Sequence, residues 1–155
     1  MEYGYLYVDF ILQGLTNYLT DLQFDAAEQD DLWHHLTVQG HKDKNLPLDM
    51  DIKTIMDTWT LQMGFPVVTV TRNYTDNIAK VTQERFLIGK SKEKKADSKL
   101  YSWWIPLSFT GVKDSFENTY SKYWMKEGEK EKEVSGLPDK DTAVVFNVQQ
   151  TGYYR

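Results

Sequence analysis

Three histidines, His34, His35 and His41, are the side chains of this sequence best suited to bind a metal ion. His34 and His35 are adjacent, and on a helix they would point about 100° apart, which prevents both from ligating one ion with ordinary geometry. Neither is followed by the Glu of an H-E-x-x-H pair, which supplies a general base beside two zinc ligands. We therefore predict that the chain contributes no metal ligand and that these histidines lie on a helix surface.

Other catalytic patterns are also missing from the sequence. There is no Cys, no G-x-S-x-G nucleophile elbow and no glycine-rich phosphate loop. Asp30 and Asp31, next to Glu28, could form a carboxylate pair for acid–base chemistry. In the first turn of a helix, however, acids are favoured by the helix dipole, which explains them without catalysis. The sequence predicts no catalytic residue and no cofactor-binding residue in this chain.

Two patterns suggest binding or modification instead. The sequon Asn73-Tyr74-Thr75 lies near an expected hairpin tip and makes Asn73 a candidate N-glycosylation site. A group of aromatic residues in the second half could be imagined as a platform that stacks sugars or peptides. Aromatics that alternate along paired strands are more typical of core packing, so we favour packing for this set. The set comprises Tyr101, Trp103, Trp104, Tyr120, Tyr123 and Trp124.

Composition limits the classes of partner. A protein that binds nucleic acid needs a clustered basic surface, whereas these 155 residues carry a net charge of −5, so we expect no nucleic-acid partner. No run approaches the roughly 18 apolar residues that span a bilayer, so we expect no direct membrane insertion by this chain. The chain has no Cys, which is compatible with the cytosol and with part of a secreted protein.

Helical periodicity dominates the first half of the chain. Apolar residues spaced by three and four predict a helix over residues 7–22, interrupted by Gly14. A second helix is expected over residues 26–39, with Asp25 as its N-cap, Leu32, Trp33 and Leu36 as its buried face, and Gly40 as its stop signal. A third should begin at Asp49 or Asp51 and end at Gly64, since Pro66 prevents continuation.

The second half reads as short strands rich in β-branched and aromatic residues. We expect strands over residues 67–74, 80–88, 101–110, 116–125 and 143–148, and the start of another over 152–155. A turn at residues 75–77 should join the first two strands. Two lysine-rich segments, residues 89–99 and 126–136, are predicted to be solvated loops. The resulting fold class is α+β, with three helices followed by an antiparallel sandwich.

Six ordered segments between Gln13 and Arg155 resemble the aminopeptidase N-like zinc aminopeptidases of the gluzincin group. The segments are QGLTNYL (13–19), DDLWHHL (30–36), MDTWTLQMGFPVVTV (56–70), QERFL (83–87), WWIPLSFT (103–110) and FNVQQTGYYR (146–155). The resemblance implies that residues 1–64 are the last helices of a thermolysin-like catalytic domain. It also implies that residues 65–155 form a fibronectin-III-like β-sandwich whose last strand is truncated, because the family's strand continues past the position of Arg155.

The family removes N-terminal amino acids from peptides with a zinc ion. It holds the zinc through H-E-x-x-H and a downstream Glu, and it binds the substrate amine through a G-x-M-x-N stretch. Neither motif occurs here, so none of those roles is carried over, and we expect this chain alone to be inactive. The resemblance implies a non-catalytic fragment that supports the remaining domains of a parent enzyme. It implies a parent on the extracellular face of the plasma membrane, with an anchor outside this chain.

A second interpretation stays open on the sequence alone. The chain could be a stand-alone β-sandwich module that binds a protein or a carbohydrate and has no peptidase activity. Such a module would need finished edge strands, because an open edge invites aggregation.

Overall fold

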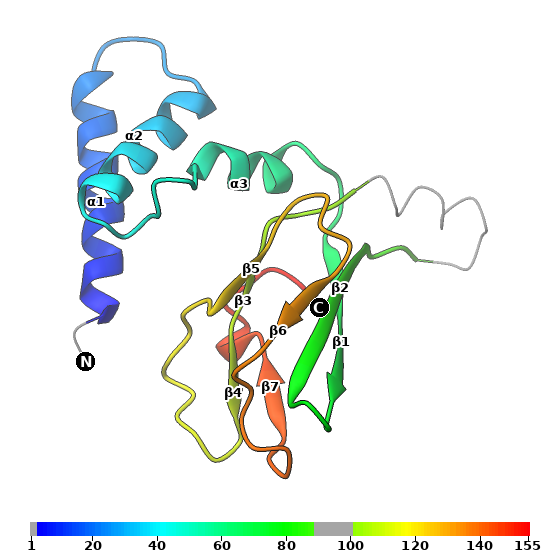
Figure 1. Cartoon of the computed structure of the whole chain (residues 1–155). Coiled ribbons are helices and arrows are strands. Elements are labelled where there is room, and N and C mark those ends of the chain that lie inside the picture. The colour runs from blue at the N-terminus through cyan, green and yellow to red at the C-terminus, as the bar shows by residue number, and fades with distance from the viewer. Residues whose placement is uncertain (1–2, 89–100) are drawn as a thin grey trace. The chain divides into compact units, whose positions relative to one another are not determined.

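The computed structural model of the chain describes residues 3–88 and 101–155 (Figure 1). Within these residues the first half forms three helices, α1 (Tyr3–Asp21), α2 (Gln29–Lys42) and α3 (Ile52–Thr60). All three helices expected from periodicity are therefore present. Their boundaries differ from the predictions for local physical reasons.

The start of α2 lies three residues later than predicted. Its N-cap is Glu28, whose backbone N–H donates to Asp31 Oδ2 at 2.8 Å, as in a capping box. Asp25 caps nothing in this helix; its carboxylate accepts from the N–H of Ala26. Asp30 and Asp31 do lie in the first turn, where the dipole favours them. Both Asp25 and Glu28 carry an acceptor and an acidic residue three positions on, so this pattern alone does not distinguish the two caps.

In the helical half of the chain, glycine marks a close helix contact rather than a helix end. Helices α1 and α2 pack together, and a Cβ on Gly14 would lie 2.8 Å from Leu36 Cδ2, so the glycine allows the close approach. The prediction that Gly40 stops α2 is wrong, because Gly40 is buried inside the helix, which continues to Lys42. Leu36 is buried as predicted, whereas Leu32 and Trp33 are only half-buried.

Helix α3 begins after Asp51, the second of its two predicted caps. Asp51 Oδ1 accepts from the N–H of Lys53 at 3.1 Å and from Thr37 Oγ1 at 3.0 Å. The helix ends at Thr60, four residues before Gly64. Gly64 still adopts the left-handed conformation expected of it, with φ +94°. Pro66 then opens the first strand rather than a further helical turn.

The strands form one three-stranded sheet and two two-stranded sheets, all antiparallel. Strand β1 (Pro66–Asn73) and β2 (Ile78–Arg85) make a hairpin in which Val70 pairs with Val81, and β2 pairs with β6 (Lys132–Val134). Strand β3 (Ile105–Leu107) pairs with β5 (Tyr123–Met125), and β4 (Phe109–Gly111) pairs with β7 (Val144–Phe146). A 3-10 turn, η1 (Val148–Gln150), follows β7.

Four predictions from the sequence are corrected, the first being the strand expected over residues 152–155, since those residues belong to no assigned strand. The stretch 101–110 is split at Ser108 into β3 and β4, and only Tyr123–Met125 of the stretch 116–125 is a strand. The lysine-rich segment 126–136 contains β6, in which Val134 is fully buried. The other lysine-rich segment, 89–99, lies wholly outside the described residues.

One buried cluster joins the three sheets. It takes Ala79 and Val81 from β2, Leu107 from β3, Met125 from β5 and Val134 from β6, all fully buried. Trp103 and Phe109 are the aromatic members of this buried cluster. The α+β class, with helices preceding antiparallel strands, is thus confirmed. The fibronectin-III-like arrangement stays a prediction, because these open sheets do not establish it.

The chain divides into two compact units, Met1–Asp57 and Thr58–Arg155. The first holds α1, α2 and most of α3, and the second holds the end of α3 and every strand described above. The last residues of α3 therefore share a unit with the sheets, and it is there that the polar contacts described next are made.

Candidate functional site

The end of α3 is bound to the backbone of the segment before β3. Thr58 Oγ1 accepts from the N–H of Trp104 at 3.2 Å, and Trp59 Nε1 donates to the carbonyl of Trp104 at 3.0 Å. Gln62 Nε2 donates to the carbonyl of Ser102 at 2.9 Å. These side chains satisfy backbone groups that no strand partner reaches, which buried backbone requires. They belong to the TWTLQ stretch that carried part of the resemblance.

Gln83 makes the same kind of contact from inside the sheet. Its Oε1 accepts from the N–H of Trp103 at 2.7 Å, and its Nε2 donates to the carbonyl of Trp103 at 3.0 Å. A single amide side chain thus satisfies both backbone groups of the most deeply buried Trp. Next to it, the Arg85 guanidinium lies 4.2 Å from the centre of the Tyr101 ring, a cation–π contact.

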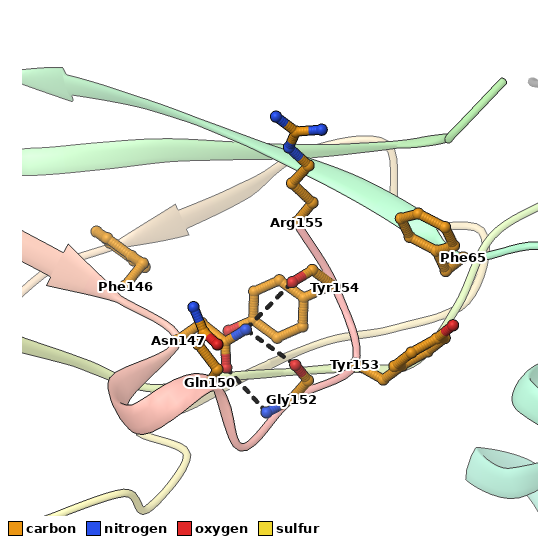
Figure 2. Close-up of a pocket in the computed structure, with 8 residues that line it drawn as sticks. All are labelled: Phe65, Phe146, Asn147, Gln150, Gly152, Tyr153, Tyr154 and Arg155. Atoms are coloured by element: carbon orange, nitrogen blue, oxygen red, sulfur yellow. Dashed lines mark hydrogen bonds between the residues drawn. The ribbon is translucent and has the colours of Figure 1, made fainter. Parts of the chain in front are cut away.

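Asn147 closes the turn that follows β7 (Figure 2). It has φ 56° and ψ 62°, a left-handed conformation that Asn tolerates better than most residues. Its Nδ2 donates to the carbonyls of Gly152 at 2.9 Å and Tyr154 at 3.2 Å, while its Oδ1 accepts from the N–H of Gly152 at 2.8 Å. Ser108 stabilises the turn with two hydrogen bonds. Its carbonyl accepts from the N–H of Asn147, and its Oγ accepts from the N–H of Val148.

A pocket of about 460 Å³ lies beside this turn. Phe65, Phe146, Tyr153 and Tyr154 provide ring surface, and Asn147, Gln150 and Arg155 provide polar groups (Figure 2). Burial raises the pKa of Tyr154 to about 12, against a smaller opposing effect of the Ser108 backbone. At neutral pH the phenol stays protonated, so the lining offers amides, phenols and a guanidinium. Such groups can bind a ligand, but they form no nucleophile–base pair.

The predicted histidines do not assemble into a metal site. His34 is exposed as expected, whereas His35 is half-buried with Nδ1 at 2.7 Å from the Asp31 carbonyl and Nε2 at 3.2 Å from Asp21 Oδ2. His41 is also half-buried, and its Nε2 lies 2.8 Å from the Met50 carbonyl. The prediction of surface histidines therefore fails for two of the three.

Zinc does not fit the residues in this part of the chain. Among the described side chains, those of residues 10–88 and 101–155, no three His, Asp or Glu gather closely enough to hold a metal ion. The imidazole nitrogens of His35 and His41 named above already face protein acceptors. The expectation that the chain contributes no zinc ligand stays a prediction for the sequence as a whole.

The remaining candidates have separate positions. Asn73 is exposed at the end of β1, where its Oδ1 accepts from the N–H of Thr75 at 2.9 Å and its Nδ2 donates to Asp76. The aromatic set does not form one exposed platform, because Trp103 and Trp104 are buried and only Tyr120 is exposed. Core packing is the better description of these rings, as predicted.

Sequence reasoning missed the polar side chains that bind backbone. Gln83 is one, and Arg72 is another: its guanidinium donates to the carbonyls of Thr142 at 2.8 Å and Pro138 at 2.6 Å. The alternation of strand residues between the two faces of a sheet could have identified them. Arg72 lies at the same strand parity as the core-facing Val68 and Val70, and Gln83 pairs with Val68, so both point inward and need buried partners.

None of the described helices has an apolar stretch long enough to cross a membrane. No protein-family model matches the sequence. Similarity to individual proteins is extensive. The chain is 33% identical over 147 residues to the thyrotropin-releasing hormone-degrading ectoenzyme of Rattus norvegicus, covering 92% of this chain and 13% of that enzyme.

Two aminopeptidases match over a still larger share of the chain. Aminopeptidase Q of Acinonyx jubatus and aminopeptidase N of Rattus norvegicus are each 32% identical over 153 residues, which covers 98% of this chain and 15% of each enzyme. The chain thus spans about one seventh of the length of the relatives it matches. Over nearly its whole length, this chain is related in sequence to one segment of the aminopeptidase N group.

Proposed function

We propose that this chain is a structural, non-catalytic segment of a zinc-dependent aminopeptidase that removes N-terminal amino acids from peptides. One observation carries the proposal: the motif residues that link the sequence to the aminopeptidases serve the backbone of their own unit. Thr58, Trp59, Gln62, Gln83 and Asn147 all point their polar atoms at main-chain groups. Contacts of this kind are those of a scaffold.

In this proposal residues 1–64 are the last helices of the catalytic domain and residues 65–155 are the β-sandwich that follows. Zinc and the peptide substrate are held elsewhere in the parent enzyme, and the partners of this chain are the parent's other domains. Exposed apolar side chains on the helical unit agree with that role, since Leu12 is 55% exposed and Leu19 66%. Neighbouring domains would cover such side chains.

We propose the extracellular face of the plasma membrane as the location of the parent, as the name ectoenzyme states for one relative. Asn73 is then a glycosylation site. Its side chain is exposed in a tight turn, so a glycan would displace no core residue. Secretion of the chain from eukaryotic cells should give a mass increase that an endoglycosidase removes. Asn73→Gln should abolish it, and Asn118→Gln, at an exposed Asn outside any sequon, should leave it unchanged.

Activity measurements test the non-catalytic role directly. The purified chain should hold no stoichiometric zinc and should hydrolyse no aminoacyl-anilide, and zinc-dependent turnover by a pure sample would overturn the proposal. A chimera tests the scaffold role. The corresponding segment of rat aminopeptidase N is replaced by this chain. The kcat of the soluble chimera, per bound zinc, should stay within a few-fold of that of unmodified rat aminopeptidase N. A folded chimera with normal zinc content and no turnover would mean that the segment supplies a catalytic group.

A further inference from the structure

The loop that joins α1 and α2 (Figure 1) presents an aromatic side chain to solvent. Phe24 in this loop has a relative exposure of 103%, so no described residue of the helical unit covers its ring. Ala26 and Ala27, which follow it, are also exposed and carry side chains too small to shield a phenyl ring. The ring therefore adds no packing energy to its own unit.

The backbone at Phe24 adopts a conformation that a bulky residue disfavours. The N–H of Asp25 donates to the carbonyl of Leu22 at 3.1 Å, which closes a turn with Phe24 at its third position. There φ is +70°, in the left-handed region that turns usually give to Gly or Asn. The Phe side chain makes this turn less favourable and gains no contact in return, so the stability of the helical unit does not explain its presence.

Acidic residues surround the ring. Residues 1–41 contain seven Asp or Glu and no Lys or Arg. Asp21 ends α1, where the helix dipole favours a cation, and its carboxylate lies 3.2 Å from His35 Nε2. Asp25 and Glu28 are exposed, and neither has a salt-bridge partner among the described residues. The dipole of α2 does not account for the first two of these acids, and together they favour a cationic surface opposite the loop.

We propose that Phe24 is an anchor residue that inserts into an apolar pocket on a part of the parent enzyme outside this chain, and that Lys or Arg side chains form the rim of that pocket. The inference rests on the proposed function. The matched segment is only 13–15% of each relative, so most of such an enzyme is available to supply the pocket. An aromatic ring at the centre with charges around it is a common arrangement of protein interfaces.

The charges exclude two other occupants of this surface. An anionic lipid surface would be repelled by the carboxylates of the loop. A second copy of the helical unit would present the same carboxylates and would be repelled as well.

The free chain tests whether the ring has a role within the chain itself. Phe24→Ala should leave the urea midpoint, followed by far-ultraviolet circular dichroism, unchanged, because the ring packs on nothing there. Phe10→Ala is the matched control, since this Phe of α1 is buried and its loss should lower the midpoint. Equal falls for the two variants would place Phe24 in the core of the chain and overturn the proposal.

The chimera with rat aminopeptidase N supplies the rest of a parent enzyme. In the chimera, Phe24→Ala should lower the midpoint of thermal inactivation by at least about 2 °C, because the pocket is left unfilled. 4-Azidophenylalanine at position 24 should cross-link on irradiation to one segment of the rat enzyme that carries Lys or Arg. The same probe at Gln23, the exposed neighbour, should give at most about a tenth of the yield. Equal or scattered cross-linking from the two positions would contradict an anchor at Phe24.

A charge variant tests the basic rim. Asp25→Asn should lower the thermal midpoint of the chimera at low ionic strength and should have no effect in 1 M salt, which screens the attraction. Asp49→Asn, at an exposed acid outside the loop, should have no effect at either ionic strength. Identical behaviour of the two variants would remove the basic rim from the proposal.

The two proposals fail in different ways. A folded chimera with normal zinc content and no turnover would contradict the scaffold role. An active chimera whose thermal midpoint does not change with Phe24→Ala would overturn the anchor alone. Self-association of the free chain that Phe24→Ala abolishes would also overturn it, because the occupant would then be a second copy.

Discussion

Gln83 holds Trp103 by both of its backbone groups, with Oε1 at 2.7 Å from the Trp103 nitrogen and Nε2 at 3.0 Å from its carbonyl oxygen. The Trp103 side chain is fully buried, so its backbone has little access to water as a substitute partner. Gln83 therefore satisfies the backbone N–H and carbonyl of one residue, as a neighbouring strand does for several residues.

Removal of the Gln83 side-chain amide should lower the stability of the folded chain. We expect Gln83→Ala to lower the free energy of unfolding by about 2–4 kcal/mol, because a buried donor and a buried acceptor are left unsatisfied. Urea denaturation followed by Trp fluorescence measures the change. Glu84→Ala, at the exposed next position, should alter stability by less than about 0.5 kcal/mol. Equal effects of the two substitutions would contradict the assigned role.

Gly152 should not tolerate a side chain. A Cβ there would lie 2.3 Å from Tyr154 Cε1 and 3.2 Å from Asn147 Oδ1, so Gly152→Ala must displace the ring. We expect a loss of about 1–3 kcal/mol from overpacking. Gly136→Ala is the control for conformation alone, because its φ is +68° and a Cβ would meet nothing within 4 Å. Its cost should be about 1 kcal/mol, the usual left-handed penalty.

Asp51 should stabilise α3 as its cap and should do so above acidic pH. Burial would raise the pKa of Asp51, but hydrogen bonds from Thr37, Lys53 and Thr54 outweigh it, and the pKa is lowered from 3.8. The stabilisation is thus present above pH 3.8 and is lost as the pH falls through the lower folded value. Asp51→Ala should cost about 1 kcal/mol at pH 7 in thermal unfolding. Asp49→Ala, at the cap position not used, should cost less.

Tyr154 should make the strand unit sensitive to alkaline pH. Its folded pKa of about 12 exceeds the unfolded value of 10, so the unfolded state ionises first as the pH rises. The contribution of this pKa difference to the free energy of unfolding is complete below pH 10 and is lost as the pH rises toward 12. In Tyr154→Phe, the urea midpoint should fall less between pH 9 and pH 11.5 than in the unmodified chain. Tyr153→Phe, at an exposed ring, should follow the unmodified chain.

The sequence was most informative where one periodicity extended over a whole element. The apolar spacing in residues 7–22 and the β-branched run in residues 67–74 predicted α1 and β1 to within four residues at each end. It was least informative for β6, whose single buried residue, Val134, sits among charges that pair on the surface. Lys132 pairs with Glu129 at 3.2 Å, and Lys80 of β2 pairs with Glu131. A strand with one inward side chain has no periodicity to detect.

The candidate-site residues could be predicted from the sequence only where they form a local pattern. Asn73 was identifiable because a sequon is a local pattern. Asn147 and Gln83 were inside quoted motifs, yet their roles were not deduced, because each depends on a backbone group brought close only by folding. The interval from Gln83 to Trp103 is 20 residues, and the interval from Thr58 to Trp104 is 46. Contacts at such separations leave no spacing rule in one sequence.

The contacts from α3 and β2 to residues 102–104 have a consequence for evolution. Thr58, Trp59, Gln62 and Gln83 bind the peptide groups of Ser102, Trp103 and Trp104, and peptide groups are the same in every residue except proline. Substitutions at Ser102 can therefore accumulate without breaking the attachment, while the four residues that make it are held fixed. Among distant homologues, Ser102 should therefore vary more than the four side chains that bind the segment, whereas burial constrains Trp103 and Trp104.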